Sequence, residues 1–162
     1  MDTNEFWNLI ERAQSPPALH AELADLPHDE LAAFERMHAE AFTQSYDWGL
    51  WGAAYVIDGG CSDDIFDYFR AYLISRGRAV FENAMADPDS LADVDIADGE
   101  EWEDWMSPTM MVIHARTGKY DFAAAPDPES QIGGQPPSGQ AWEEDELPSR
   151  FPRLAAKYGW TS

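Results

Sequence analysis

The sequence predicts a mainly α protein, a compact single domain with a long Pro/Gly-rich loop and a docked C-terminal short helix. Three observations predict this class. Apolar residues recur at helical spacing through the first half of the chain, and residues that cap helices precede these stretches. Apolar residues make up 44% of the chain and aromatic residues 13%, which is enough to build a core and excludes a wholly disordered chain. A single cysteine excludes a disulfide framework within the chain.

Three helices are predicted before residue 47. Asp2 is followed three residues later by Glu5, a variant of the capping box, which predicts a first helix from about residue 3. Ser15 precedes Pro16, a pairing typical of a helix start, and the short second helix ends near residue 25. The third helix is expected over residues 29–46, with its apolar stripe facing the core.

The next segment, residues 47–57, is apolar on almost every side and is predicted to be a central helix. Gly59 and Gly60 can end it, because glycine adopts positive φ at little cost. Ser62 is the expected cap of an amphipathic helix over residues 62–75. Another short helix is expected at 78–86, followed by a turn through Leu91.

The second half of the chain is less regular. Residues 109–116 fit either a helix or a short buried strand, because so short an apolar run has no decisive period. In the tail, Pro152 is expected to open a last short helix that Gly159 ends. The predicted organisation is one domain of four parts: a helical core at about 3–92, an acidic loop at about 93–106, a Pro/Gly-rich loop at about 122–141, and the tail at 142–162.

Charge narrows the classes of partner. Thirty-one acidic against ten basic residues give a net charge of −21, which repels nucleic acid and anionic membranes and attracts a basic or cationic protein. No Lys or Arg lies between Arg78 and Arg116. No run approaches the ~18 apolar residues of a membrane span, and the acidic start is unlike a signal peptide, so a cytoplasmic location is expected. Four Trp lie among acids or in loops and are expected to be exposed beside them: Trp102, Trp105, Trp142 and Trp160.

The best candidate site lies where the central helix meets the helix after the double glycine. Asp67 and Arg70 are spaced to share a helix face and to pair. An Arg beside carboxylates and aromatic rings can hold a polar ligand, although the same pair fits a purely structural salt bridge. The candidate ligand-binding residues are Trp51, Tyr55, Asp58, Cys61, Asp63, Asp67 and Arg70.

Two further motifs contain residue types that can take part in catalysis or bind a metal. Cys61 precedes a helix N-terminus, which favours a thiolate nucleophile, but a small core cysteine is the commoner role. Glu35 and His38 form a Glu-x-x-His pair, as in di-iron bundles, yet no second such pair exists. No metal and no cofactor are therefore expected.

Several motifs resemble the bacterial family called domain of unknown function 4240. They are Phe6-Trp7, the run from Trp51 to Asp64 (WGAAYVIDGGCSDD), Phe66-Asp-Tyr-Phe-Arg70, Leu73-Ile-Ser-Arg-Gly77 and Pro88-Asp-Ser-Leu91. The resemblance covers roughly residues 3–92 and implies a small, mainly helical bacterial domain. It carries over no catalytic residue.

Two functions from different classes follow. The favoured one is a non-enzymatic, strongly acidic interaction or regulatory module for a basic protein partner. The alternative is a small enzyme or small-molecule-binding protein, for example of a biosynthetic pathway. Its pocket would be lined by Trp51, Tyr55, Asp58 and Arg70. The sequence leaves open whether the protein is an enzyme and which oligomeric state it adopts.

Overall fold

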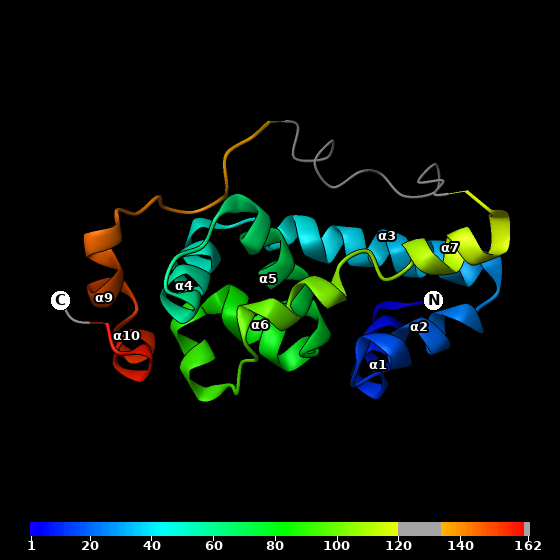
Figure 1. Cartoon of the computed structure of the whole chain (residues 1–162), viewed down its shortest axis with the longest axis horizontal. Helices are drawn as coiled ribbons and strands as arrows, with labels where there is room; N and C mark the ends of the chain where they lie inside the picture. The colour runs from blue at the N-terminus through cyan, green and yellow to red at the C-terminus, as the bar shows by residue number, and fades with distance from the viewer. Residues whose placement is uncertain (120–133, 161–162) are drawn as a thin grey trace.

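The computed structural model describes residues 1–119 and 134–160 and is mainly α, as the sequence predicts. No strand is present within these two ranges, and Asp47 and Ser138 form an isolated bridge. Six helices make up the first half of the chain (Figure 1): α1 (Thr3–Arg12), α2 (Pro16–Ala24), α3 (His28–Gln44), α4 (Trp48–Asp58), α5 (Asp63–Ser75) and α6 (Arg78–Ala86).

The predicted helix starts are made by local side-chain bonds. Asp2 accepts the backbone N–H of Glu5 at 2.9 Å and completes a capping box with that residue. Ser15 and Ser62 likewise accept backbone N–H groups in the first turns of α2 and α5. At the C-terminal end of α4, Gly59 has a φ of 73°. This is the left-handed conformation that glycine adopts readily where a helix ends.

The turn expected through Leu91 is a short 3₁₀ helix, η1 (Pro88–Asp93). The acidic loop expected at about 93–106 contains two more such helices, η2 (Gly99–Glu101) and η3 (Glu103–Trp105). Residues 110–117 then form α7 (Met110–Thr117), which settles the choice between helix and strand in favour of helix. Of the expected Pro/Gly-rich loop, residues 122–133 lie outside the described residues, and 134–141 contain no helix.

The C-terminal segment docks on the body of the protein, as predicted, and it does so against α4 and η1. It contains η4 (Glu144–Glu146), α9 (Leu147–Arg150) and α10 (Pro152–Tyr158). The indole N–H of Trp142 donates to the Trp48 carbonyl at 2.7 Å. The buried Asp89 carboxylate accepts the backbone N–H groups of Arg153 and Leu154, and so holds the first turn of α10.

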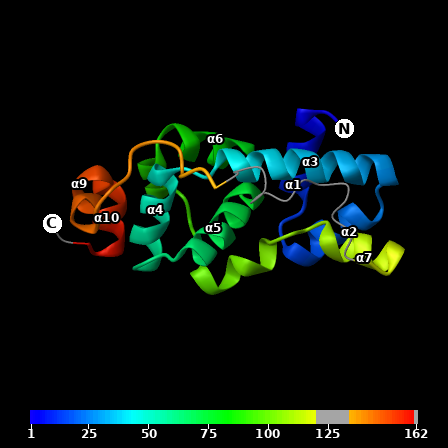
Figure 2. The same ribbon diagram turned by 90° about the horizontal axis from the view of Figure 1, so that it is seen from above.

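The two ends of the molecule are built from different parts of the chain. Figure 2 shows α9 and α10 beside α4 at one end of the long axis, and α2 beside α7 at the other. Between them lies a continuous apolar core that includes Phe34, Leu50, Phe66 and Phe69, each with an exposed fraction of 0%. No helix in the described ranges is both long and apolar enough to cross a bilayer.

Candidate functional site

The predicted contact between α4 and α5 exists and is made by aromatic rings. Trp51 of α4 stacks on Phe66 of α5 with ring centres 4.9 Å apart and an interplanar angle of 8°. The Trp51 indole N–H also donates to the Cys61 carbonyl at 2.9 Å, just before α5 begins. Trp48 also stacks on Trp51, with ring centres 5.4 Å apart. Rings therefore fill much of this junction.

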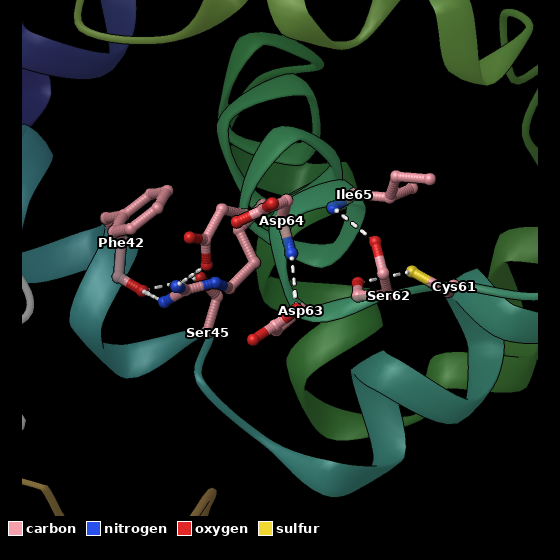
Figure 3. A network of polar contacts seen from close by, with 9 residues as sticks. Phe42, Ser45, Cys61, Ser62, Asp63, Asp64 and Ile65 are labelled. Atoms are coloured by element: carbon pink, nitrogen blue, oxygen red, sulfur yellow. Dashed lines mark hydrogen bonds and ion pairs between the residues drawn. The ribbon is translucent and has the colours of Figure 1, made fainter.

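Arg70 lies inside the protein rather than at its surface. Its side chain is 2% exposed, and it donates to the Phe42 carbonyl at 2.6 Å and to Asp67 Oδ1 at 2.5 Å. The guanidinium carbon lies 3.8 Å from the centre of the Phe42 ring. Burial lowers the pKa of Arg70, and the Asp67 carboxylate opposes this shift. Figure 3 shows the Phe42 carbonyl at which α3 and α5 are joined.

Three other candidates lie toward the surface. The Tyr55 hydroxyl donates to Glu144 at 2.9 Å, and this bond to a carboxylate raises the pKa of Tyr55. Asp58 is exposed at the end of α4, where partial burial of the carboxyl and the nearby charge of Asp98 raise its pKa. Asp63 is exposed in the first turn of α5, where its charge favours the helix dipole.

Cys61 is buried, with an exposed fraction of 9%. Burial raises the pKa of its thiol to about 12, and the charges of Asp58 and Asp67 raise it further. Its Sγ donates to the Ser62 carbonyl at 3.6 Å. This is the environment of a core cysteine and not that of an activated nucleophile.

The seven candidates therefore occupy different places. The structure brings Asp67 to Arg70, and Trp51 to Cys61. In the described residues, no hydrogen bond or ion pair joins Arg70 to Asp58 or to Tyr55. Tyr55 instead contacts the C-terminal segment, with its ring 5.2 Å from that of Trp142.

Two Trp expected to be exposed are buried, which corrects the sequence interpretation. Trp102 is 0% exposed and Trp105 9% exposed, whereas Trp142 and Trp160 are half-buried. Trp102 packs edge-on against Phe69 at 5.0 Å and donates its indole N–H to the Ala97 carbonyl at 2.9 Å. A large buried ring contacts neighbouring groups on all sides, and these contacts hold the surrounding backbone in place.

This anchoring gives the acidic segment, defined here as residues 93–104, a fixed shape against α5. The segment has seven carboxylates and no Lys or Arg, and every one of these carboxylates is exposed. Of these seven carboxylates, only Asp93 forms an ion pair within the described residues, and its partner is Arg153. The expected acidic surface is therefore ordered, because the buried rings of Trp102 and Trp105 anchor its backbone.

A groove that the sequence did not indicate lies beside this segment. It has a volume of about 470 Å³ and runs between α2 and α7 (the α2–α7 groove). None of the seven candidates lines it. Its walls are mainly Pro, Met, Leu and Trp side chains, contributed by Pro16, Pro17, Leu19, His20, Asp104, Trp105, Met106, Ser107, Pro108 and Met111.

Contacts distant in the sequence hold the groove together. Arg116 of α7 donates to the Ala24 carbonyl at 2.9 Å and to the Leu26 carbonyl at 2.6 Å, which satisfies the C-terminal end of α2. Thr109, just before α7, lies beside the buried Glu35 of α3; burial raises the pKa of the Glu35 carboxyl, and the Thr109 side chain opposes this shift. The cluster of Met and Pro at residues 106–111 was the available sequence signal, but its partner wall comes from residues 16–20.

Ser107, in the wall of the groove, has a φ of 47°. It is the one non-glycine residue with positive φ among residues 1–119 and 134–160. Such a conformation costs about 1–3 kcal/mol for a side chain other than glycine, and it is found preferentially at functional sites. The strained turn directs the chain from η3 into α7 and so shapes the groove.

The described part of the chain holds no group of three or more His, Cys, Asp or Glu side chains arranged for a metal ion. Comparison with known proteins gives one family. The model described as protein of unknown function (DUF4240) matches residues 1–117, from α1 through α7. Neither a curated protein nor a solved structure matches the chain. The match confirms the resemblance seen in the sequence motifs and extends it beyond residue 92, and the chain thus belongs to the DUF4240 family.

Proposed function

We propose that this protein is a non-enzymatic interaction module of the bacterial cytoplasm whose acidic segment binds a basic protein partner. The observation that carries the proposal is the burial of Trp102. Because this ring is 0% exposed and packs on Phe69, the carboxylates around it are held on a fixed surface. A surface that is already ordered loses little conformational entropy on binding. A flexible acidic tail would lose much more, because it would have to become ordered at the same time.

Charge supports a basic partner specifically. The exposed carboxylates of the acidic segment have no Lys or Arg among them, and the whole chain carries −21. Such a field steers positively charged proteins toward the segment and speeds their association. It repels other acidic proteins and nucleic acids by the same physics.

The interaction role is better supported than a small-molecule pocket between α4 and α5. A pocket there would use the guanidinium of Arg70 to hold its ligand. Arg70 is 2% exposed, and its two terminal nitrogens already donate to Phe42 and Asp67. Trp51 and Phe66 are stacked on each other across the same junction.

The test is carbodiimide cross-linking in a lysate of the native cell, since this reagent joins a carboxylate only to an amine in contact with it. We expect cross-links between the acidic segment and lysines of one partner protein. Replacing Glu100→Gln and Glu101→Gln together should remove most of this product. The matched control, Glu40→Gln with Asp145→Asn, also removes two exposed charges, but it lies outside the segment and should leave the product unchanged.

Two results would overturn the proposal. One is a set of cross-links scattered over many proteins, which indicates a merely solubilising charge. The other is an equal loss of product in the test and control variants, because the segment would then contribute nothing beyond its share of the total charge.

A further inference from the structure

We infer that the α2–α7 groove binds an apolar anchor residue of the partner, similar in size to Leu or Met. This residue lies within a segment of the partner that is rich in Lys and Arg. The inference rests on the proposed function and adds the chemistry of the contact. It starts from the position of the groove, because Asp104 and Trp105 belong both to its wall and to the region of the acidic surface.

The groove is apolar and partly open. Met111 in its wall is 54% exposed, and it is the one large hydrophobic side chain found so exposed in the described residues. Met side chains are flexible and polarisable, so they adapt to the shape of an incoming aliphatic group. The Pro16, Pro17 and Pro108 rings in the walls are rigid and lose no side-chain entropy on contact.

The rim of the groove selects the charge of what enters. Asp104 lines the groove, and Glu100, Glu101 and Glu103 are exposed on the turns just before it. The guanidinium of Arg116 on α7 donates to carbonyls at the end of α2 and is therefore already engaged. An apolar group with Lys or Arg on its flanks would satisfy both the groove and its rim.

A second copy of this chain fits less well as the occupant. At a net charge of −21, two copies repel each other, and a homodimer through this face would bring two acidic segments together. Residues 120–133 of the same chain contain no Lys or Arg, so they also lack the complementary charge.

The experiment selects binders for the whole protein from a displayed library of random peptides, and then maps the strongest peptide by NMR of labelled Met methyl groups. We expect the enriched peptides to combine an aliphatic residue with Lys or Arg. The methyl signals of Met106 and Met111 should shift, and that of Met85, which packs against the core, should not. Replacing the aliphatic residue by Ser should weaken binding roughly tenfold.

Variants separate the groove from the charge. Met111→Ser should weaken the selected peptide roughly tenfold without changing the Tm, because this side chain is largely exposed. The matched control is Ala115→Ser, an exposed position of α7 outside the groove, and it should bind as the unchanged protein does.

The outcomes distinguish the two proposals. Basic peptides without an apolar residue that perturb residues 100–104 but not Met111 would overturn the groove inference and leave the proposed function standing. Apolar peptides without Lys or Arg that shift Met111 would overturn the basic partner in both proposals. Concentration-dependent dimerisation that shifts Met111 would identify a second copy as the occupant and overturn this inference alone.

Discussion

Arg70 contacts Phe42 twice: its guanidinium donates to the Phe42 carbonyl at 2.6 Å and stacks 3.8 Å from the centre of the Phe42 ring. The contact joins the last turn of α3 to the middle of α5, and Asp67 neutralises the buried charge from one turn earlier in α5. Among the described residues, Arg70 Nε has no hydrogen-bond partner. A buried charge with one partner removed is strongly destabilising, so this arrangement acts as a unit.

Arg70→Ala is expected to lower the free energy of unfolding by about 3 kcal/mol, because it leaves Asp67 partly buried without its partner and opens a cavity against Phe42. Urea unfolding followed by circular dichroism measures this change. Arg36→Ala is the control, since Arg36 is exposed on α3 and its loss should cost less than about 0.5 kcal/mol. Equal values for the two variants would contradict a structural role for Arg70.

The Cys61 thiol is expected to react slowly. With a pKa raised to about 12 by burial, the thiolate fraction at neutral pH is at least about a hundredfold lower than that of an exposed cysteine. Labelling with a thiol-specific disulfide reagent, with and without denaturant, measures the difference. A labelling rate in the folded protein as fast as in the unfolded chain would show that Cys61 is accessible and activated.

The burial of His38 is expected to make the protein less stable in mild acid. Burial lowers its pKa from 6.5 to about 4, so between these values the unfolded chain binds more protons than the folded protein. Stability should therefore decrease as pH falls from about 7 toward 4, by about 1–3 kcal/mol from this residue. His38→Gln should flatten that part of the profile. Parallel profiles for the two proteins over this range would argue against a depressed pKa.

Trp102 is expected to hold the acidic segment in place. Trp102→Ala should cost about 3–5 kcal/mol, as for other large buried rings, because it empties a space against Phe69 and Tyr72. Trp102→Phe should cost less, since it keeps a ring but loses the bond to the Ala97 carbonyl. Hydrogen exchange should be fastest over residues 97–105 in the Ala variant. Unchanged exchange there would contradict the anchoring role.

Gly52 predicts where the C-terminal segment can be loosened. A Cβ at this position would lie 2.7 Å from Phe151 Cε2 and 3.0 Å from Trp142 Nε1. The helix gains about 1 kcal/mol from Gly52→Ala, but overpacking costs typically about 1–3 kcal/mol. We expect faster hydrogen exchange over residues 142–160 with α5 unaffected. Slower exchange in the variant would mean that the side chains rearrange freely.

The sequence predicted those parts of the fold that local chemistry determines. Asp2, Ser15 and Ser62 cap helices with bonds to backbone N–H groups three residues away, so their pattern is visible in the chain itself. The prediction for Trp102 is wrong because its acidic neighbours suggest exposure, whereas the ring is buried against Phe69, thirty-three residues earlier in the chain.

The candidate site shows the same limit. Spacing correctly paired Asp67 with Arg70, a contact within one helix. It could not show that Arg70 points inward, because the Phe42 carbonyl that receives it belongs to another helix. Likewise the α2–α7 groove joins residues 16–20 to residues 104–111, and no local pattern brings these two stretches together.

The fit of the C-terminal segment over Gly52 bears on other members of the family. That segment lies beyond residue 117, where the family match ends, yet Trp142, Leu147 and Phe151 fill the space that a larger residue at position 52 would occupy. A relative that ends after α7 lacks these side chains, so it can carry a bulkier residue at position 52. Position 52 and the presence of an extension should consequently vary together in evolution.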